Sequence, residues 1–481
     1  MARLSDLLQR DLDSDPEISG VTADSRKVRS GYLFVALAGA KADGRSFIPA
    51  AIEAGAAAVL APEDVAGLSA PVVHAADLRR AYALAARAFY GAQPKTCVAV
   101  TGTNGKTSVA VFCRQIFERL GHKSASMGTL GVTAGGEQLT APGLTTPDAA
   151  DVSRLLAELA FKGVTHLALE ASSHGVDQRR LDGVDLRAAG FTNLTQDHLD
   201  YHGTMGAYRA AKLRLFEALL PRGGVAVLNA DSDAYGAFAA AAVTSGHTLF
   251  SVGEGGQGLK LIDRRLVPEG QRLKLLAEDR IYDVRLPLAG GFQASNALVA
   301  AGLCIGAGEA AEAVLAVLEQ IEGAPGRLQR VGSGARGGEA YVDYAHTPDG
   351  LETVLKALRP HARGRLIVVF GAGGDRDRGK RPLMGKAAAT LADVAIVTDD
   401  NPRSEEPGSI RAAILAAAPG AAEIGDRREA IRVASAMLED GDVLVVAGKG
   451  HEQGQTVGAD VHPFDDVTET AAALGLETVH G

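Results

Sequence analysis

The chain has 481 residues, of which 46% are hydrophobic and 22% charged, and its net charge is −9. This acidic balance, with no long basic run, argues against a nucleic-acid partner and against a polybasic membrane-binding surface. No apolar stretch is long enough to cross a bilayer, and the acidic first segment does not resemble a signal peptide. The scattered cysteines, Cys97, Cys113 and Cys304, fit a reducing compartment. We therefore expect a cytoplasmic protein of roughly three domains.

Short apolar runs alternate with alanine-rich helical stretches near the start of the chain. The runs YLFVAL, AAAVLA and PVVHA predict strands, so we expect a small α/β domain over residues 1–92. The segment YGAQPKT at 90–96 contains a glycine and a proline and predicts a linker.

The second block begins with the apolar run CVAV and the glycine-rich segment TGTNGKTS at 101–108. Apolar residues then recur at helical spacing up to Gly121, which predicts a helix directly after the turn. Further strands are predicted at THLALE and GVAVLN. We expect a central domain on a mainly parallel sheet over residues 93–325.

Three strongly apolar strands are predicted in the third block, over residues 326–481. They are LIVVF at 366–370, VAIVT at 394–398 and VLVVA at 443–447, and helical stretches separate them. Continuous apolar runs of this kind are typical of parallel strands with both faces covered. The sequence therefore predicts a Rossmann-like C-terminal domain.

The segment TGTNGKTS has the composition of a phosphate-binding loop between a strand and a helix. Gly102 and Gly105 allow backbone N–H groups to turn toward phosphate oxygens, and the helix N-terminus adds partial positive charge. Lys106 can reach the β- and γ-phosphates, and the Thr107 hydroxyl can bind Mg²⁺. Val100 stands where the standard pattern has its first glycine, so this loop is a variant. The alternative is a glycine-rich turn without a ligand.

Several residues of the central block could serve catalysis, although each has an ordinary structural explanation. Glu170 ends a predicted strand and could hold Mg²⁺, but it could also be a surface carboxylate. His198 and His202 could be ligands or structural histidines. Lys212 lies on an amphipathic helix, where a lysine commonly extends along the surface toward water.

The ends of the three C-terminal strands carry charged and polar residues of both signs. Because the carboxyl ends of parallel strands meet at one edge of a sheet, we expect these residues to lie together. Arginine can grip a carboxylate with paired hydrogen bonds, and acidic groups suit an ammonium, so the cluster suits a zwitterion. A capped turn is the alternative for the segment DNPR. The residues are Arg376, Asp400, Asn401, Pro402, Arg403, Gly448 and Glu452.

The ordered series TGTNGKTS, LEASSHG, NLTQDHLDYHGTM with YRAAK, FQASNALVA, GRLQ and VDYAHTPD resembles the Mur ligases, the ATP-dependent amino-acid ligases of peptidoglycan synthesis. The resemblance covers nearly the whole chain. It implies an N-terminal domain that binds a uridine nucleotide, a central ATP-binding domain and a C-terminal domain that binds an amino acid. Its expected substrates are ATP, UDP-MurNAc-L-Ala-D-Glu and meso-diaminopimelate, because family members that select diaminopimelate share the DNPR segment. The expected product is an amide at the D-Glu γ-carboxylate, formed through an acyl phosphate.

The resemblance also implies roles for individual residues. Lys106, Glu170, His198 and Lys212 are the expected catalytic residues. Thr107, Glu170, His198 and a carbamylated Lys212 are the expected Mg²⁺ ligands, and His346 is expected near the nucleotide. The expected ATP-binding residues are Gly102, Thr103, Asn104, Gly105, Lys106, Thr107, Ser108, Asn296, Arg327 and Asp343. The expected residues for the UDP-linked substrate are Ala23, Ser25, Ala40, Lys41, Ala42, Thr145, Thr146, Ser172, Gln178 and Arg180.

The expected diaminopimelate site is the cluster at the C-terminal strand ends, where Arg403 is a partner for the distal carboxylate that lysine lacks. We expect a monomer with no nucleic-acid partner and no membrane insertion. Two alternatives remain open. One is a ligase similar to folylpolyglutamate synthetase, and the other is a nucleotide-binding regulator without catalysis.

Overall fold

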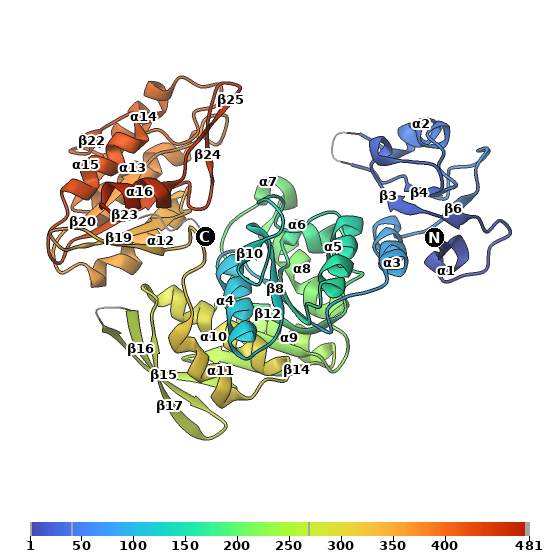
Figure 1. Cartoon of the computed structure of the whole chain (residues 1–481), viewed down its shortest axis with the longest axis horizontal. Helices are drawn as coiled ribbons and strands as arrows, with labels where there is room; N and C mark the ends of the chain where they lie inside the picture. Colours follow the sequence, from blue (N-terminus) through green and yellow to red (C-terminus); the bar gives the residue numbers. More distant parts are fainter. Residues whose placement is uncertain (1, 40–41, 268–269, 477–481) are drawn as a thin grey trace. The chain divides into compact units, whose positions relative to one another are not determined.

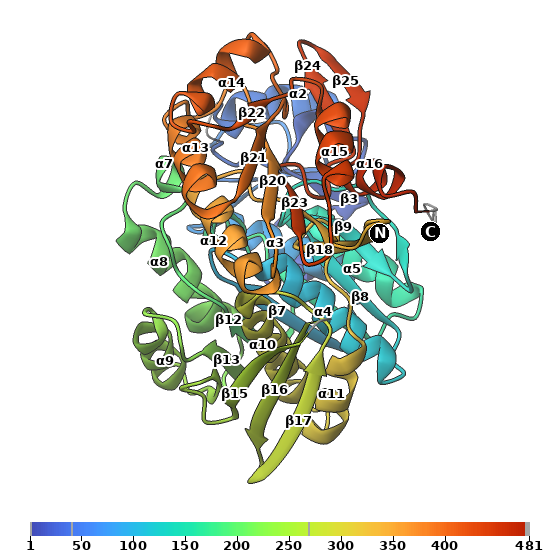
Figure 2. The same ribbon diagram turned by 90° about the vertical axis from the view of Figure 1, so that its left-hand side faces the viewer.

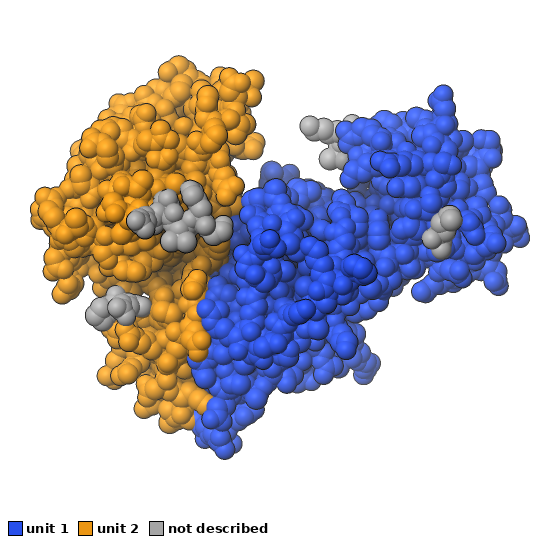
Figure 3. Space-filling model, viewed as in Figure 1, with its two compact units in different colours: residues 1–261, 276–280, 298–317 blue, residues 262–275, 281–297, 318–481 orange. Residues whose placement is uncertain are grey.

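A computed structural model of the chain describes residues 2–39, 42–267 and 270–476 (Figure 1). The chain divides into two compact units (Figure 3). Unit 1 contains residues 1–261, 276–280 and 298–317, and unit 2 contains residues 262–275, 281–297 and 318–481. Among the helices that the structure describes, none combines the length and the apolar character needed to cross a membrane.

The first part of unit 1 is the small α/β sheet predicted from the sequence. Its elements are β1 (Ala2–Arg3), α1 (Leu4–Leu8), β2 (Glu17–Ile18), β3 (Gly20–Thr22), β4 (Tyr32–Val35), α2 (Ile48–Glu53), β5 (Ala58–Ala61), β6 (Val72–His74) and α3 (Leu78–Tyr90). Strands β3, β4, β5 and β6 are parallel, in that order. Alternate strand residues point to opposite faces. Leu33 and Leu60 therefore pack with α1 and α3, whereas Phe34 and Val59 pack with α2.

The second part of unit 1 is built on the predicted parallel sheet. Its elements are β7 (Thr96–Thr101), α4 (Lys106–Arg119), β8 (Ser124–Gly128), β9 (Gly131–Ala134), β10 (Glu137–Gln138), α5 (Ala149–Phe161), β11 (His166–Glu170), α6 (Ser173–Asp177), β12 (Leu186–Phe191), α7 (Leu199–His202), α8 (Met205–Arg214), β13 (Val225–Asn229), α9 (Tyr235–Thr244) and β14 (Thr248–Gly253). The strand order is β10-β9-β8-β11-β7-β12-β13-β14. The strands β8, β11, β7, β12, β13 and β14, which are neighbours in that order, are parallel. The carboxyl ends of β7, β11 and β12 therefore lie at one edge.

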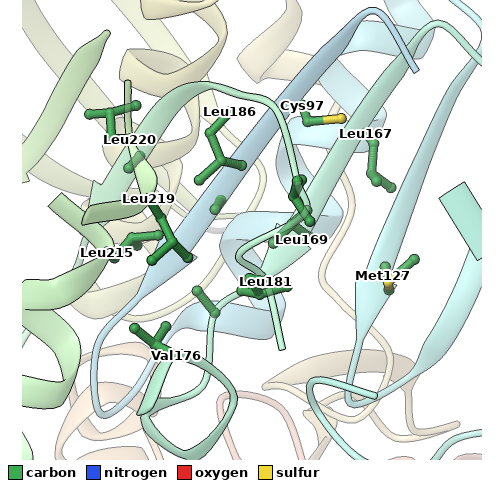
Figure 4. Close-up of a cluster of buried hydrophobic side chains, with 14 of the residues drawn as sticks. Cys97, Met127, Leu167, Leu169, Val176, Leu181, Leu186, Leu215, Leu219 and Leu220 are labelled. Atoms are coloured by element: carbon green, nitrogen blue, oxygen red, sulfur yellow. The ribbon is translucent and has the colours of Figure 1, made fainter. Parts of the chain in front are cut away.

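Buried side chains of these strands form a large apolar core on one face of the sheet (Figure 4). Cys97, Leu167 and Leu186 come from three neighbouring strands and lie close together there (Figure 4). Their sequence neighbours Val98 and Ala168 are also buried, on the opposite face. Burial on both faces explains why these strands read as continuous apolar runs.

The chain then passes between the two units. The elements of this part are β15 (Leu259–Val267), β16 (Gly270–Ala277), β17 (Arg280–Leu286), α10 (Gly291–Gly306) and α11 (Ala311–Val317). Strand β15 begins in parallel pairing with β14, through Leu259 and Lys260. Helix α10 packs on the sheet of unit 1, where Leu303 contacts Gly190 so closely that a Cβ on this glycine would lie 3.0 Å from the leucine Cδ1.

Unit 2 contains the C-terminal sheet. Its elements are β18 (Gln329–Ser333), β19 (Glu339–Asp343), α12 (Pro348–Leu358), β20 (Leu366–Phe370), α13 (Lys380–Leu391), β21 (Val394–Val397), α14 (Pro407–Leu415), β22 (Ala422–Glu423), α15 (Arg427–Ala436), β23 (Val443–Ala447), β24 (Gly454–Val457), β25 (Asp460–Pro463) and α16 (Asp466–Ala473). The order is β18-β19-β23-β20-β21-β22, and all pairs except β18 with β19 are parallel. Helices α12 and α13 cover one face and α15 and α16 the other (Figure 2). The three predicted apolar strands are confirmed as β20, β21 and β23.

Candidate active site

The glycine-rich segment joins β7 to α4, as predicted. Gly105 has a φ of +88° immediately before the first residue of α4, and Gly102 has a φ of +152°. A Cβ on Gly102 would lie 1.9 Å from Thr192 Oγ1, so this position also needs glycine for space. The turn therefore depends on backbone conformations and a close approach that other residues do not tolerate.

A second segment, directly after β12, fixes the shape of this turn. Asn193 O accepts a hydrogen bond of 2.9 Å from Thr103 N, and Asn193 Oδ1 accepts one of 2.9 Å from Asn104 N. Thr192 Oγ1 donates to Asn104 O at 2.6 Å. These contacts hold the loop in shape, which is what a preformed phosphate site requires. The glycine-rich motif did not predict these contacts, because Thr192 and Asn193 lie about 90 positions further along the chain.

Two lysines point at the same backbone carbonyl of the loop. Lys106 Nζ donates to Gly102 O at 2.9 Å and to Thr103 O at 2.8 Å, and Lys212 Nζ donates to Gly102 O at 2.7 Å. Lys212 is 1% exposed, so the interpretation as a surface lysine is wrong. Its Nζ lies 4.4 Å from the centre of the Tyr208 ring. Burial, together with the charge of Lys106, lowers the pKa of Lys212 well below its usual value.

Glu170, at the carboxyl end of β11, is buried and is not a surface carboxylate. Its Oε2 accepts a hydrogen bond of 3.1 Å from Thr107 Oγ1, so the structure joins two of the predicted Mg²⁺ ligands. Thr129, which the sequence reasoning missed, donates its backbone N–H to Glu170 Oε1 at 2.8 Å and its hydroxyl to Oε2 at 3.2 Å. Gly128 is the preceding residue, and a Cβ there would lie 2.0 Å from Glu170 Oε1. The tight turn beside β8 thus orients the carboxylate.

The residues predicted to hold the D-glutamyl end of the first substrate are connected to Glu170. Thr146 Oγ1 donates to the backbone oxygen of Glu170 at 3.0 Å and lies 3.0 Å from Ser172 Oγ, and Thr145 Oγ1 lies 2.9 Å from Thr129 Oγ1. Arg180 donates to Thr146 O at 2.6 Å and to Gln178 Oε1 at 2.7 Å. The structure therefore brings all five predicted residues into one polar network: Thr145, Thr146, Ser172, Gln178 and Arg180.

His198 lies less directly in this network. It has a φ of +52° just before α7, and its side chain is 47% exposed. Its ring lies 4.9 Å from the His174 ring and 6.2 Å from the Tyr208 ring, centre to centre. Among the described residues, the structure records no direct contact of His198 with Glu170 or Lys212. An imidazole in this position is accessible to a ligand.

The predicted uridine-site residues lie in the small N-terminal sheet region. Ser25 begins a single 3₁₀ turn that Asp24 caps, and the partly buried Ala23 precedes it. Ala42 is exposed, and its carbonyl accepts a hydrogen bond of 2.9 Å from Gly39 N. Ala40 and Lys41 lie outside the described residues.

Two of the residues predicted near the nucleotide, Arg327 and His346, lie against the ring of Tyr344. Arg327 stacks over the Tyr344 ring at 4.5 Å, and the His346 ring lies 4.6 Å from that ring. Asp343 is buried, which raises its pKa to about 6, and it accepts hydrogen bonds from Leu328 N and Ala345 N. Asn296 is also buried, on α10, and donates to Gln293 Oε1 at 3.2 Å. Both carboxylate oxygens of Asp343 thus hold backbone groups.

The C-terminal cluster is assembled from three strand ends, as predicted. Asn401 Nδ2 donates to Glu452 Oε2 at 2.9 Å, and Lys449 Nζ donates to Asn401 Oδ1 at 3.0 Å and contacts Glu452 Oε2 at 3.3 Å. Lys449 is fully buried. Sequence reasoning missed Lys449, although the signal was present: a lysine two residues after an apolar strand and three residues before a glutamate.

Arg403 lies on the loop after β21 and has a φ of +52°. Its Nη1 donates to Gly374 O at 2.9 Å, while Gly374 N donates to Asn401 O at 2.9 Å. Asp375 accepts hydrogen bonds from the backbone and the hydroxyl of Ser404. The loops after β20 and β21 are therefore tied together, which fixes the starting position of the guanidinium.

The remaining predicted residues of the cluster lie on the same three loops. Arg376 is exposed, whereas Asp400 and Pro402 are buried. Gly448 has a φ of +122°, and a Cβ there would lie 2.7 Å from Asp400 Oδ2. The site offers both signs of charge and could hold a zwitterionic amino acid.

Three family models match the chain: "Mur ligase family, catalytic domain" at residues 17–92, "Mur ligase middle domain" at 100–304, and "Mur ligase, glutamate ligase domain" at 326–450. The UDP-N-acetylmuramoyl-L-alanyl-D-glutamate–2,6-diaminopimelate ligase of Caulobacter vibrioides is 70% identical over 98% of both chains. The ligase of the same name from Mesorhizobium japonicum is 55% identical over 96% of both.

Solved structures give a consistent result. A structure of a UDP-N-acetylmuramoyl-L-alanyl-D-glutamate–2,6-diaminopimelate ligase matches with a TM-score of 0.75 and 35% identity, covering 98% of this chain and 99% of that chain. A folylpolyglutamate synthase of Mycobacterium tuberculosis matches with a TM-score of 0.63, but at 20% identity, covering 82% and 94%. The second match shows a shared fold alone.

Proposed function

The chain belongs to the Mur ligase family, and we infer that it is the ATP-dependent ligase that adds meso-2,6-diaminopimelate to UDP-MurNAc-L-Ala-D-Glu. The observation that carries this function is the 70% identity with the Caulobacter ligase over 98% of both chains. The enzyme acts in peptidoglycan synthesis. A folylpolyglutamate synthetase activity has only the shared fold in its favour, and a regulator without catalysis would not need the ordered site described above.

The proposed arrangement has three domains. Residues 1–92 bind the UDP end of the first substrate, residues 93–325 bind ATP on the P-loop and parallel sheet, and residues 326–481 form a Rossmann-like amino-acid-binding domain. The protein acts as a cytoplasmic monomer. Parallel strands whose carboxyl ends carry the predicted ligand-binding residues support this assignment of the second and third domains.

In the first step, an oxygen of the D-Glu γ-carboxylate attacks the γ-phosphorus of ATP. The new P–O bond forms as the bond to ADP breaks, which leaves an acyl phosphate. Lys106 balances the charge that develops on the phosphate oxygens, and the backbone N–H groups of the loop orient them. Thr146, Ser172 and Arg180, which hydrogen bonds connect to Glu170, hold the D-glutamyl end.

The residues around Glu170 suit Mg²⁺. The hydroxyl of Thr107 and the carboxylate of Glu170 are oxygen donors, which this ion prefers, and they already contact each other. His198 and carbamylated Lys212 complete the proposed ligand set, and Mg²⁺ bound there would neutralise phosphate charge. The lowered pKa of Lys212 supports carbamylation, because only the neutral amine attacks CO₂, forming an N–C bond and releasing a proton.

In the second step, the amine of diaminopimelate attacks the acyl carbon, and phosphate leaves with the carbonyl re-formed and the amine proton lost. Asn401 and Glu452 hold the amino-acid end of the substrate. Arg403 receives the distal carboxylate, exchanging its hydrogen bond with Gly374 O for a charge-assisted pair. Such a pair contributes about 1.5–3 kcal/mol, which is enough to select against lysine.

The test uses the full chain with UDP-MurNAc-L-Ala-D-Glu, ATP and Mg²⁺, and offers either meso-diaminopimelate or L-lysine. Phosphate release and product mass are measured. We expect one ADP and one phosphate per amide formed, with strong preference for diaminopimelate. Absence of turnover with either amino acid would refute the function, and equal turnover with lysine would refute the role of Arg403 alone.

A further inference from the structure

A cluster of two histidines and one glutamate lies in unit 1, away from the residues assigned to the ligase reaction. His122 follows the end of α4, His166 is the first residue of β11, and Glu309 lies in the turn between α10 and α11. One ligand atom from each of the three lies within 4.8 Å of the others. Glu170 ends the same strand that His166 begins, so the cluster is about 13 Å from that end of the sheet.

The three side chains converge on one carboxylate oxygen. His122 Nε2 lies 2.9 Å from Glu309 Oε1, and His166 Nε2 lies 3.8 Å from the same oxygen. The two imidazole rings are 3.9 Å apart, centre to centre, with an interplanar angle of 33°. The Phe117 ring lies 4.6 Å from the His166 ring and forms an apolar wall on this side.

The far nitrogen of the His166 ring also has a polar partner. Thr165 Oγ1 lies 2.9 Å from His166 Nδ1 and 3.2 Å from Lys123 O. In the tautomer that donates from Nδ1 to this hydroxyl, Nε2 carries a lone pair and faces Glu309 Oε1 at 3.8 Å. Two electron-rich atoms facing each other are repulsive unless a cation lies between them. A hydrogen bond from the far ring nitrogen to a hydroxyl is also how metal-binding histidines are commonly held.

An ion pair between His122 and Glu309 explains only part of this arrangement. It does not explain why the second imidazole, that of His166, turns its Nε2 toward the same oxygen at 3.8 Å. We propose that His122, His166 and Glu309 bind one divalent transition-metal ion, with Zn²⁺ the best match to two imidazole nitrogens and one carboxylate oxygen. Mg²⁺ prefers oxygen donors, so the site is chemically distinct from the one at Glu170. The ion connects the end of α4, the start of β11 and the turn between α10 and α11.

Cobalt(II) is the probe, because its visible absorption reports nitrogen coordination and low coordination number. Full-length protein stripped with a chelator is titrated with Co²⁺ in excess Mg²⁺, without nucleotide, and Zn²⁺ is then added as competitor. We expect one Co²⁺ per chain with an intense visible band that Zn²⁺ abolishes. We also expect Zn²⁺ to raise the melting temperature, because an ion that binds the folded chain stabilises it.

The variants are His122→Gln and Glu309→Gln, both at partly exposed side chains that a folded chain should tolerate. Each should weaken Co²⁺ binding by about tenfold or more and remove the Zn²⁺-dependent shift in melting temperature. His198→Gln is the matched control. It should keep the band, because His198 follows the carboxyl end of β12 and is not one of the three residues of the cluster. The proposal is overturned if wild type gives no band, if both variants bind as wild type does, or if His198→Gln removes the band.

Discussion

Two buried lysines, one in each unit, have opposite surroundings. Lys212 in unit 1 is 1% exposed, donates to the carbonyl of Gly102 and shares that oxygen with the cation Lys106. Lys449 in unit 2 is fully buried and donates to Asn401 while contacting the carboxylate of Glu452. Burial of a charge is costly unless it is paired. Burial and the charge of Lys106 therefore lower the pKa of the first lysine, which favours its reactive neutral amine, whereas the second lysine orients its neighbours.

The largest expected effect is at the reactive lysine. Lys212→Ala should lower turnover by about 10²-fold or more, because it removes a group that stabilises charge at the phosphate. Short-chain carboxylates should restore part of the rate by occupying the space of the carbamate. Steady-state phosphate release with and without added acetate or propionate measures this. Lys449→Ala is the matched control, and rescue of both variants by carboxylates would show that the two lysines do not differ as described.

The second effect concerns selection of the amino acid. Arg403→Ala should lower kcat/KM for meso-diaminopimelate by about 10- to 150-fold, since roughly 1.5–3 kcal/mol of charge-assisted binding is lost. The KM for ATP should change less, because the Arg403 guanidinium donates to Gly374 O and not to the residues predicted to hold the nucleotide. Competition between diaminopimelate and L-lysine, followed by product mass, gives the specificity ratio.

Arg376→Ala is the control for Arg403, because it removes an exposed arginine from the neighbouring loop. If it changes the diaminopimelate-to-lysine ratio as much as Arg403→Ala does, selection belongs to the whole cluster and not to one guanidinium.

The third effect tests the orienting lysine. Lys449→Met should raise the KM for diaminopimelate by about tenfold, because Asn401 Oδ1 loses one of its two donors and Glu452 loses its cation. The effect on kcat should be smaller, since the acyl phosphate forms at the other site. Initial rates at saturating ATP separate the two constants. A fall in kcat at unchanged KM would contradict an orienting role.

The smallest effect is on stability, where the two lysines should differ in sign. In CO₂-free buffer at pH 7, Lys212→Met should raise the free energy of unfolding by about 1 kcal/mol, and Lys449→Met should lower it by a similar amount. Burial lowers the pKa of Lys212 in the folded state, below the 10.5 of an ordinary lysine, so unfolding takes up a proton. The gain from Lys212→Met should therefore shrink as pH rises toward 10.5. Denaturant unfolding at several pH values checks both signs, and equal signs for the two variants would contradict the comparison.

Motifs that are continuous in the sequence predicted their own structure well. The strand, glycine turn and helix around Lys106 are present, and the three apolar runs of the last block are parallel strands. Partners from distant segments were not predictable, as Thr129 and Asn193 show. Each contacts a predicted residue only after the chain has folded, and neither has a spacing that marks it beforehand.

Lys212 illustrates most clearly the difference between what the sequence predicts and what the tertiary structure decides. Its helix and the phosphate loop are both predictable from the sequence, because local propensity and periodicity depend on near neighbours. Whether the lysine meets water or the carbonyl of Gly102 depends on how α8 packs beside the loop, over 110 positions of chain. The sequence by itself therefore determined the elements, the order of the motifs and the family. Only the tertiary structure decided which charged groups are buried and with what partners, since burial and electrostatics arise from residues far apart in the chain.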